Sequence, residues 1–401
     1  MVTTLACPTR LLRLSGMRIL HTSDWHLGRS FHNVGMADAQ QHAINFMIET
    51  ITERDIDLVL IAGDVYDRAL PPVDAVAMFD QALVDMHAAG ATVIVTSGNH
   101  DSAIRLGFMS RMMRDVYIRT MPESITDPIV FAPDDAAPVC IWTVPYLEPR
   151  YHAAEFGVAA NHTAVMGYVM EQVRAEISTR GLEHATHILM AHLFAAGASG
   201  SESERNIGQG EVGTLGQVPA DIFDGMDYVA LGHLHGRQSM SDTVRYSGSP
   251  VAYSFSEVNH TKGMWLLDTH HELTIEPVDI PQLKQLAVLK DEITPLLESQ
   301  QYAWAEDAWC QITVTDPKRP PHAFRRLKHR FPGMLNFILA PTGGVEAQTT
   351  YSDRIAKATT DMDLILDFVD HVRNRPASDN EHRWLTEALH HVNRVTAQDV
   401  K

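Results

Sequence analysis

Short segments rich in aspartate, asparagine and histidine constrain this chain most, because each follows a run of residues that predicts a strand. In α/β folds functional groups gather at the carboxyl ends of strands, so segments far apart in sequence can meet at one edge of a sheet. We therefore expect the fold to bring these segments together. They are Asp24-Trp25-His26, Gly63-Asp64-Val65-Tyr66-Asp67, Gly98-Asn99-His100-Asp101, Ala191-His192 and Gly232-His233-Leu234-His235.

The side chains in these segments are of the kinds that bind divalent metal ions. Carboxylate, amide and imidazole groups without a thiolate suit Mn²⁺, Fe²⁺ or Zn²⁺ better than a soft metal. They are too many for one tetrahedral ion with an open position, but they suit two ions if one carboxylate bridges them. One such segment alone is more often a loop or a satisfied core group, whereas the combination favours a metal site. The candidate ligands are Asp24, His26, Asp64, Asn99, His192, His233 and His235.

From Met17 to about Pro281, short strand patterns alternate with longer amphipathic helix patterns, which predicts an α/β layered domain. Strands are expected at residues 19–22, 58–62, 92–96, 141–144, 187–191, 228–231 and 244–246. Helices are expected at residues 37–54, 73–89 and 160–179. Residues 264–268 and 273–278 predict a hairpin of two strands.

The pattern changes after Pro281, and a smaller α+β unit is predicted from residues 286–297, 310–315 and 335–339. Two amphipathic helices are expected to close the chain, one with an apolar stripe through Leu364 and Phe368, the other with a stripe through Trp384 and Leu385. The expected organisation is a tail at 1–16, a main domain at 17–281, a capping domain at 282–358 and C-terminal helices at 359–401.

The composition limits the classes of protein and partner. The chain of 401 residues has a formal net charge of −18, so a nucleic-acid substrate would need bound metal, a local basic patch or a partner to offset repulsion. No apolar stretch is long enough to span a bilayer, and the three cysteines lie too far apart for a zinc ribbon or a redox motif. Residues 1–16 are expected to be a disordered tail or a misassigned start rather than a secretory signal, which favours a cytoplasmic protein without membrane contact.

The order of the metal-binding segments resembles the calcineurin-like metallophosphoesterase superfamily. Residues 21–29, His-Thr-Ser-Asp-Trp-His-Leu-Gly-Arg, are similar to the opening of the bacterial SbcD family, the nuclease subunits of SbcCD complexes. Further matches are residues 62–67, Pro71-Pro72, 97–102 and 246–250. Up to about Pro281 the resemblance rests on sequence motifs. After Pro281 it rests only on the order of the expected domains and helices. It implies an α/β fold, a metallophosphoesterase β-sandwich flanked by helices, with a smaller C-terminal α+β capping domain and C-terminal helices.

The resemblance also implies a role for each candidate residue. One metal ion is expected on Asp24, His26, Asp64 and His235. The other is expected on Asp64, Asn99, His192 and His233. Both ions are divalent, with Mn²⁺ favoured. His100 matches the catalytic histidine that protonates the leaving oxygen, and Asp101 is expected to orient it through a hydrogen bond. Archaeal and eukaryotic relatives can carry a histidine at the position of Asp67.

The activity implied by the resemblance is cleavage of DNA in repair, replication and recombination, by a double-strand 3'-5' exonuclease that is also an endonuclease on single strands and hairpins. The implied partners are an SbcC-like ATPase and a second copy of this chain, in a heterotetramer. Because the sequence has no G-x-x-x-x-G-K-[ST] loop, any ATP requirement must come from the partner. A phosphatase or cyclic-nucleotide phosphodiesterase of the same superfamily, and a non-catalytic scaffold, remain alternatives.

Four further segments each have two interpretations. Residues 197–216 are a surface loop, or a substrate-side loop near His192. The two C-terminal stripes pack on their own domain, or they bind the base of an SbcC-like coiled coil. A basic cluster is either a solvated helix face or a contact to the phosphate backbone of DNA. Its residues are Lys318, Arg319, Arg325, Arg326, Lys328 and Arg330. Homodimer contacts or ordinary core packing explain Met78, Phe79, Leu83, Phe108, Met109, Met112 and Met113.

Overall fold

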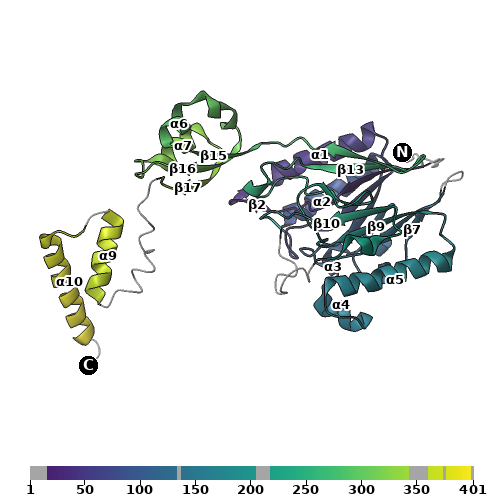
Figure 1. Cartoon of the computed structure of the whole chain (residues 1–401), viewed down its shortest axis with the longest axis horizontal. Coiled ribbons are helices and arrows are strands. Elements are labelled where there is room, and N and C mark those ends of the chain that lie inside the picture. The colour runs from purple at the N-terminus through teal and green to yellow at the C-terminus, as the bar shows by residue number, and fades with distance from the viewer. Residues whose placement is uncertain (1–15, 133–136, 205–216, 343–359, 374–375, 399–401) are drawn as a thin grey trace, which may run out of the picture. The chain divides into compact units, whose positions relative to one another are not determined.

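The computed structural model describes residues 16–132, 137–204, 217–342, 360–373 and 376–398 (Figure 1). The tail expected at 1–16 therefore lies outside the described residues except for Gly16, as does the end of the expected capping domain. The contacts divide the chain into two units. The first unit comprises Met1–Thr313 and His322–Ile338, and the second comprises Val314–Pro321 and Leu339–Lys401. Within the described residues, no helix combines the length and the apolar character needed to cross a membrane.

Two six-stranded sheets form the core of the first unit. The first sheet contains, in order, β14 (Thr274–Asp279), β13 (Gly263–Asp268), β1 (Arg18–Thr22), β4 (Leu58–Ala62), β5 (Thr92–Thr96) and β6 (Val116–Arg119). The last four run parallel, and β13 and β14 join them as an antiparallel pair. Strands β1, β4 and β5 are almost entirely buried, which explains their continuous apolar sequences.

The second sheet also has four parallel strands. It contains, in order, β11 (Gln238–Ser239), β12 (Val244–Tyr246), β10 (Tyr228–Gly232), β9 (Thr186–His192), β8 (Val139–Thr143) and β7 (Ile129–Phe131). The four inner strands run parallel, while β11 and β7 are antiparallel at the two edges. Parallel strands end at the same edge of a sheet, so the loops that follow them lie together.

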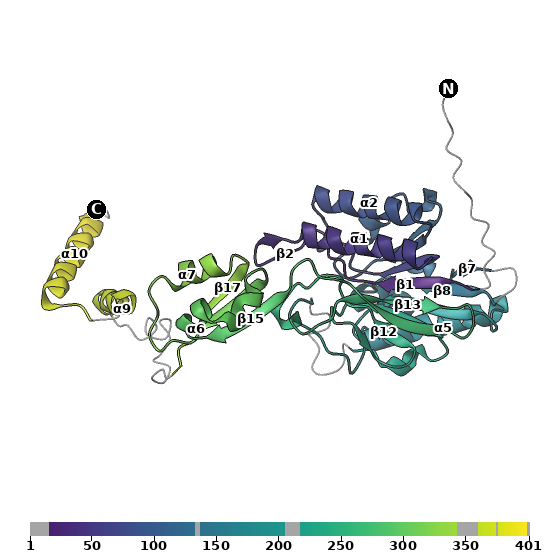
Figure 2. The same ribbon diagram turned by 90° about the horizontal axis from the view of Figure 1, so that it is seen from above.

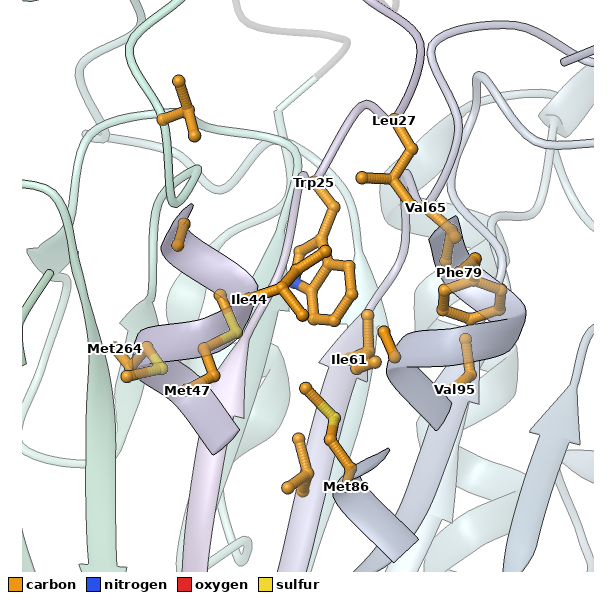
Figure 3. Close-up of a cluster of buried hydrophobic side chains, with 14 of the residues drawn as sticks. Trp25, Leu27, Ile44, Met47, Ile61, Val65, Phe79, Met86, Val95 and Met264 are labelled. Carbon is orange, nitrogen blue, oxygen red and sulfur yellow. The ribbon is translucent and has the colours of Figure 1, made fainter. Parts of the chain in front are cut away.

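The two sheets pack face to face, with helices on both outer faces. Side chains such as Ile19 and Leu60 of the first sheet share one buried cluster with Ile188 and Met190 of the second. Helices α1 (Ala37–Glu53) and α2 (Val73–Ala88) cover the first sheet, and α5 (His162–Arg180) covers the second (Figure 2). Figure 3 shows Trp25 between the two helices that cover the first sheet. The expected β-sandwich flanked by helices is confirmed.

The elements predicted in this unit are present, with ends within about two residues of those expected. The predicted hairpin is the β13–β14 pair, with Leu267 opposite Ile275. The sequence missed several short elements, because so few residues do not show a period. The missed elements are β2 (Ser30–Phe31), β3 (Val34–Gly35), α3 (Ala103–Leu106), β6, β7, α4 (Pro149–Phe156) and β11.

The predicted α+β elements after residue 281 are also present. A three-stranded sheet has the order β15 (Leu286–Asp291), β16 (Trp309–Val314) and β17 (Met334–Leu339). Helix α6 (Ile293–Glu298) contacts α7 (Ala323–Arg330) and β15. In the second unit, α9 (Asp361–Arg373) and α10 (Asp379–Gln398) contact each other. Phe368 in the apolar stripe of α9 is 53% exposed, and Trp384 in that of α10 is 60% exposed.

Candidate metal centre

The predicted segments lie at the carboxyl ends of neighbouring strands. Asp24 and Asp64 follow β1 and β4 of the first sheet, and His233 follows β10 of the second. His192, the last residue of β9, joins the two sheets because its Nδ1 lies 3.1 Å from the carbonyl oxygen of Ala62 in β4. The sandwich therefore brings the segments of both sheets to one place.

Four candidate ligands have a left-handed backbone, which few residues other than glycine adopt. The φ angle is 55° at Asp24, 46° at His26, 47° at Asp64 and 107° at His233. The N–H of His26 donates to the carbonyl oxygen of Asp64 at 3.0 Å, and the N–H of His233 donates to Oδ1 of Asp24 at 2.9 Å. Such conformations cost about 1–3 kcal/mol each and cluster at functional sites. The backbone therefore marks this edge of the sandwich as functional.

Asp24, His26 and His235 form a first ligand group, in which one oxygen or nitrogen atom from each lies within 4.8 Å of the others. The Nε2 atoms of His26 and His235 are 3.0 Å apart. The hydroxyl of Ser23 donates to Oδ2 of Asp24 at 2.5 Å and orients that carboxylate. All three ligands are buried. The group is therefore built to hold its donor atoms together away from bulk water.

Asp64, His192 and His233 form a second ligand group by the same criterion. Asn99 joins them, since its Oδ1 lies 3.0 Å from Nε2 of His192 and 3.3 Å from Nδ1 of His233. Nε2 of His192 is also 3.4 Å from Oδ2 of Asp64. The structure thus brings together the four residues that the family resemblance implies for one ion.

Asp64 connects the two groups. Its Oδ2, which faces His192, is also 3.7 Å from Nε2 of His26 in the first group. Its Oδ1 accepts a hydrogen bond from the backbone N–H of His100 at 2.8 Å. One carboxylate oxygen is therefore oriented by the backbone while the other faces both groups, as a bridging ligand requires.

The residues fit two divalent cations. Imidazole and carboxylate lone pairs converge in a buried place, which is favourable only when a proton or a cation lies among them. Nδ1 of His26 is also buried without a hydrogen-bond partner among the described residues. The donors are nitrogen and oxygen without sulfur, a set that suits Mn²⁺, Fe²⁺ or Zn²⁺.

Burial and neighbouring charges set the protonation of these ligands. Burial raises the pKa of Asp24 to about 6. Burial opposes the charged form of His192, but the Asp64 carboxylate outweighs it and raises the pKa of His192 to about 9. Burial lowers the pKa values of His26 and His233 well below their usual range. These two imidazoles are therefore neutral near pH 7, whereas a cation on the second group competes with the proton of His192.

His100 lies at the edge of both groups, and its partner differs from the one expected. Nδ1 of His100 is 2.7 Å from the carbonyl oxygen of Asp67, so it carries a proton, while Nε2 is 4.0 Å from Oδ2 of Asp64. The carboxylate of Asp101 instead accepts hydrogen bonds from the backbone N–H groups of Val65, Tyr66 and Gly98. These contacts give the orienting role to Asp67, while Asp101 ties the loops after β4 and β5 together.

Sequence analysis missed a group of polar residues behind His235. The hydroxyl of Ser203 is 2.6 Å from Nδ1 of His235 and donates to Glu257 at 2.6 Å, which in turn pairs with Lys262. No strand or ligand spacing marks these residues, so no sequence signal could have identified them. Ser203 lies in the segment expected to be a surface loop or to lie near His192. The described part of that segment reaches His235, and residues 205–216 lie outside the described residues.

The basic cluster at residues 318–330 is only partly available to bind a ligand. Nζ of Lys328 donates to the carbonyl oxygen of Met334 at 2.8 Å, and Arg330 forms an ion pair with Glu306 at 2.9 Å. These two cations therefore hold the smaller sheet and its helices together. Arg325 and Arg326 of α7 are exposed.

Some of the apolar residues that were assigned to homodimer contacts or core packing are buried, and others are exposed. Phe79 and Leu83 of α2 are buried, as core packing requires. In contrast, an exposed apolar surface is formed by Phe108, Met109, Met112 and Met113. Core packing therefore does not explain the second set.

Comparison with known proteins gives a family match and several solved structures. Residues 17–237 match the calcineurin-like phosphoesterase family. A protein of Thermus thermophilus has 12% identity and a TM-score of 0.40, covering 66% of this chain and 100% of that chain. An archaeal phosphodiesterase has 12% identity and a TM-score of 0.29, covering 65% and 100%. A dimetal phosphatase from Danio rerio has 11% identity and a TM-score of 0.39, covering 66% and 99%. The matched residues 17–237 include every candidate ligand.

Proposed function

Because this chain belongs to the calcineurin-like phosphoesterase family, we propose that it is a two-metal phosphodiesterase that cleaves DNA. In this proposal it is the nuclease subunit of an SbcCD-type complex, and Mn²⁺ is the metal. One observation carries the chemistry: Oδ2 of Asp64 lies 3.4 Å from His192 of one ligand group and 3.7 Å from His26 of the other. Two ligand groups that share a carboxylate suit hydrolysis of a phosphate ester.

Bound cations would neutralise the phosphate and lower the pKa of a water molecule. Asp24, His26 and His235 would hold one, Asn99, His192 and His233 the other, and Asp64 both. The protein's own contribution to proton transfer is His100. The carbonyl oxygen of Asp67 keeps a proton on Nδ1, and Nε2, which lies 4.0 Å from Oδ2 of Asp64, faces the ligand groups. A protonated Nε2 at this place is positioned to donate to the leaving oxygen, a step worth about 10²–10⁴ in rate.

DNA is proposed as the substrate on three grounds. Residues 21–29 resemble the opening segment of SbcD-type nucleases. The chain continues beyond the matched family region into the three-stranded sheet β15–β16–β17 and two C-terminal helices, which offer surface for a polymeric substrate or a partner. The apolar residues Phe368 and Trp384 on those helices are exposed, which suits the helix-in-groove contact proposed with an SbcC-like ATPase.

Cleavage assays with Mn²⁺ test this proposal. We expect the purified chain to degrade linear duplex DNA from free ends and to open hairpins, with faster turnover than on p-nitrophenyl phosphate esters. Blocking the duplex ends should slow exonuclease cleavage. Asp64→Asn should abolish hydrolysis of every substrate, because Asp64 serves both ligand groups.

The same assays separate the alternatives. Turnover of small phosphate esters without cleavage of DNA would favour a phosphatase or cyclic-nucleotide phosphodiesterase. If the chain took up no Mn²⁺ at all, the non-catalytic scaffold would replace both. Co-purification with an SbcC-like ATPase, followed by the same DNA assay, tests the proposed partner.

A further inference from the structure

His235 is held at three of its polar groups. Its backbone N–H donates to Oε1 of Glu204 at 2.8 Å, and its carbonyl oxygen accepts from Nζ of Lys262 at 2.8 Å. Its ring Nδ1 lies 2.6 Å from the hydroxyl oxygen of Ser203. The remaining polar atom, Nε2, faces Nε2 of His26 in the first ligand group. These contacts direct Nε2, rather than Nδ1, toward the place of the metal.

The single hydroxyl proton of Ser203 decides which ring nitrogen of His235 is protonated. Oγ of Ser203 is 2.6 Å from Oε1 of Glu257 and 2.7 Å from Oγ of Ser201. If Ser203 gives its proton to either neighbour, it has only lone pairs left for His235. If Ser203 instead donated to His235, its lone pair would face the carboxylate of Glu257 at 2.6 Å, which is repulsive. Ser203 therefore accepts a hydrogen bond from Nδ1–H of His235.

The carboxylate that orients Ser203 is kept charged by a buried partner. Glu257 is 1% exposed and Lys262 is 2% exposed, and their side chains form an ion pair. Burial opposes ionisation of Glu257, but the Lys262 ammonium beside it holds the pKa of that carboxyl well below its usual range. Nζ of Lys262 also donates to Oγ of Ser249 at 3.0 Å, which fixes the ammonium group.

We propose that Lys262, Glu257 and Ser203 are positioning residues that fix the proton of His235 on Nδ1 and so present the lone pair of Nε2 to a divalent cation. The inference rests on the proposed function and extends it to residues outside the ligand segments. A ligating histidine whose second nitrogen donates to a fixed acceptor typically gains about 10–100-fold in metal affinity. The three residues lie at positions 203, 257 and 262, so only the fold places them in a row behind His235.

Calorimetric titration of the full chain with Mn²⁺ alone tests the proposal. Two binding steps are expected for the wild type. In Ser203→Ala, one step should weaken about 10–100-fold while the other is retained, because Nδ1–H of His235 loses its acceptor. Ser199→Ala is the matched control, since it removes the same group from an exposed side chain four residues away, and Ser199 bonds Gln238 through its backbone atoms. The control should keep both steps.

A spectroscopic test needs no stable variant of Ser203. In metal-free wild-type protein with ¹⁵N-labelled histidine, we expect His235 to have a protonated Nδ1 and an unprotonated Nε2. Its signals are identified by their loss in His235→Gln. The opposite tautomer would overturn the proposal, as would unchanged Mn²⁺ affinity in Ser203→Ala or equal weakening in both serine variants. No DNA enters these measurements, so a failure of the nuclease proposal is separate from a failure of this one.

Discussion

A Cβ atom on Gly98 would lie 2.2 Å from Oδ1 of Asp64. The loop after β5 therefore touches the carboxylate that faces both ligand groups, and the backbone N–H of Gly98 also donates to Asp101 at 2.9 Å. A side chain at this position would push Asp64 away from His26 and His192. The close approach of two loops is the reason that a glycine precedes Asn99.

Gly98→Ala is expected to lower Mn²⁺ affinity at both ligand groups by at least about tenfold, because displacement of Asp64 affects every bond that it shares. Titration calorimetry with Mn²⁺ measures the effect. Gly167→Ala is the control: this glycine lies within α5, and among the described residues no atom beyond its chain neighbours and its own helix backbone is within 4 Å of an added Cβ. The control should keep metal affinity and gain up to about 1 kcal/mol of helix stability. If Gly98→Ala kept the wild-type affinity for Mn²⁺, the loops after β4 and β5 could move apart without displacing Asp64 from its ligand groups.

His100→Asn is expected to keep both bound ions but to lose cleavage by about 10²–10⁴-fold, because the variant lacks the proton donor for the leaving oxygen. Metal content after dialysis and single-turnover cleavage of duplex DNA measure the two effects separately. Loss of bound metal in parallel with activity would identify His100 as a ligand instead.

Metal uptake is expected to depend on pH. In the metal-free protein His192 has a pKa of about 9, so at pH 7 it carries a proton that a cation must displace. Affinity of the second group should rise as pH increases toward 9 and level off above it. Titrations in two buffers of different ionisation enthalpy should show release of about one proton when the second group binds its ion at about pH 7.5. No proton release at this pH would mean that His192 is neutral before metal binds.

The raised pKa of His192 also has a stability consequence in the metal-free protein. The folded pKa of about 9 exceeds the value of about 6.5 for an unperturbed histidine. Its contribution to stability is therefore complete below about pH 6.5 and is lost as pH rises toward 9. Denaturant unfolding in the presence of a chelator, from about pH 6 to about pH 9, should show this loss in the wild type and a smaller one in His192→Gln.

Removal of the residues after about 375 is expected to abolish binding to an SbcC-like ATPase while Mn²⁺-dependent cleavage remains, because the candidate ligands, His100 and the residues behind His235 all lie before residue 263. Phe368→Glu with Trp384→Glu should have the same effect through the two exposed stripes. Val130→Glu, at an apolar position of β7 that is 44% exposed, is the control for an added surface charge. Retained co-purification after truncation would place the partner contact elsewhere.

Periodicity was sufficient to predict the α/β layers, motif order identified the candidate ligands, and the family resemblance implied the sandwich. Strands such as β4 are buried on both faces, so their sequences are continuously apolar, and α1 and α2 show the spacing of helices with one buried side. Candidate ligands such as Asp64 and His192 could be identified because α/β folds place functional groups directly after strands. These features are local, and a sequence displays local features directly.

Tertiary structure alone decided which groups surround those ligands. Asp67 was expected only as a variable position, yet its carbonyl oxygen binds His100, while Asp101 holds backbone N–H groups of two loops. Likewise, Ser203 contacts His235, and Glu257 contacts Ser203, from segments with no sequence motif. Main-chain acceptors and long-range side-chain contacts depend on how loops cross in space. The spacing of residues along a chain carries no information on that crossing.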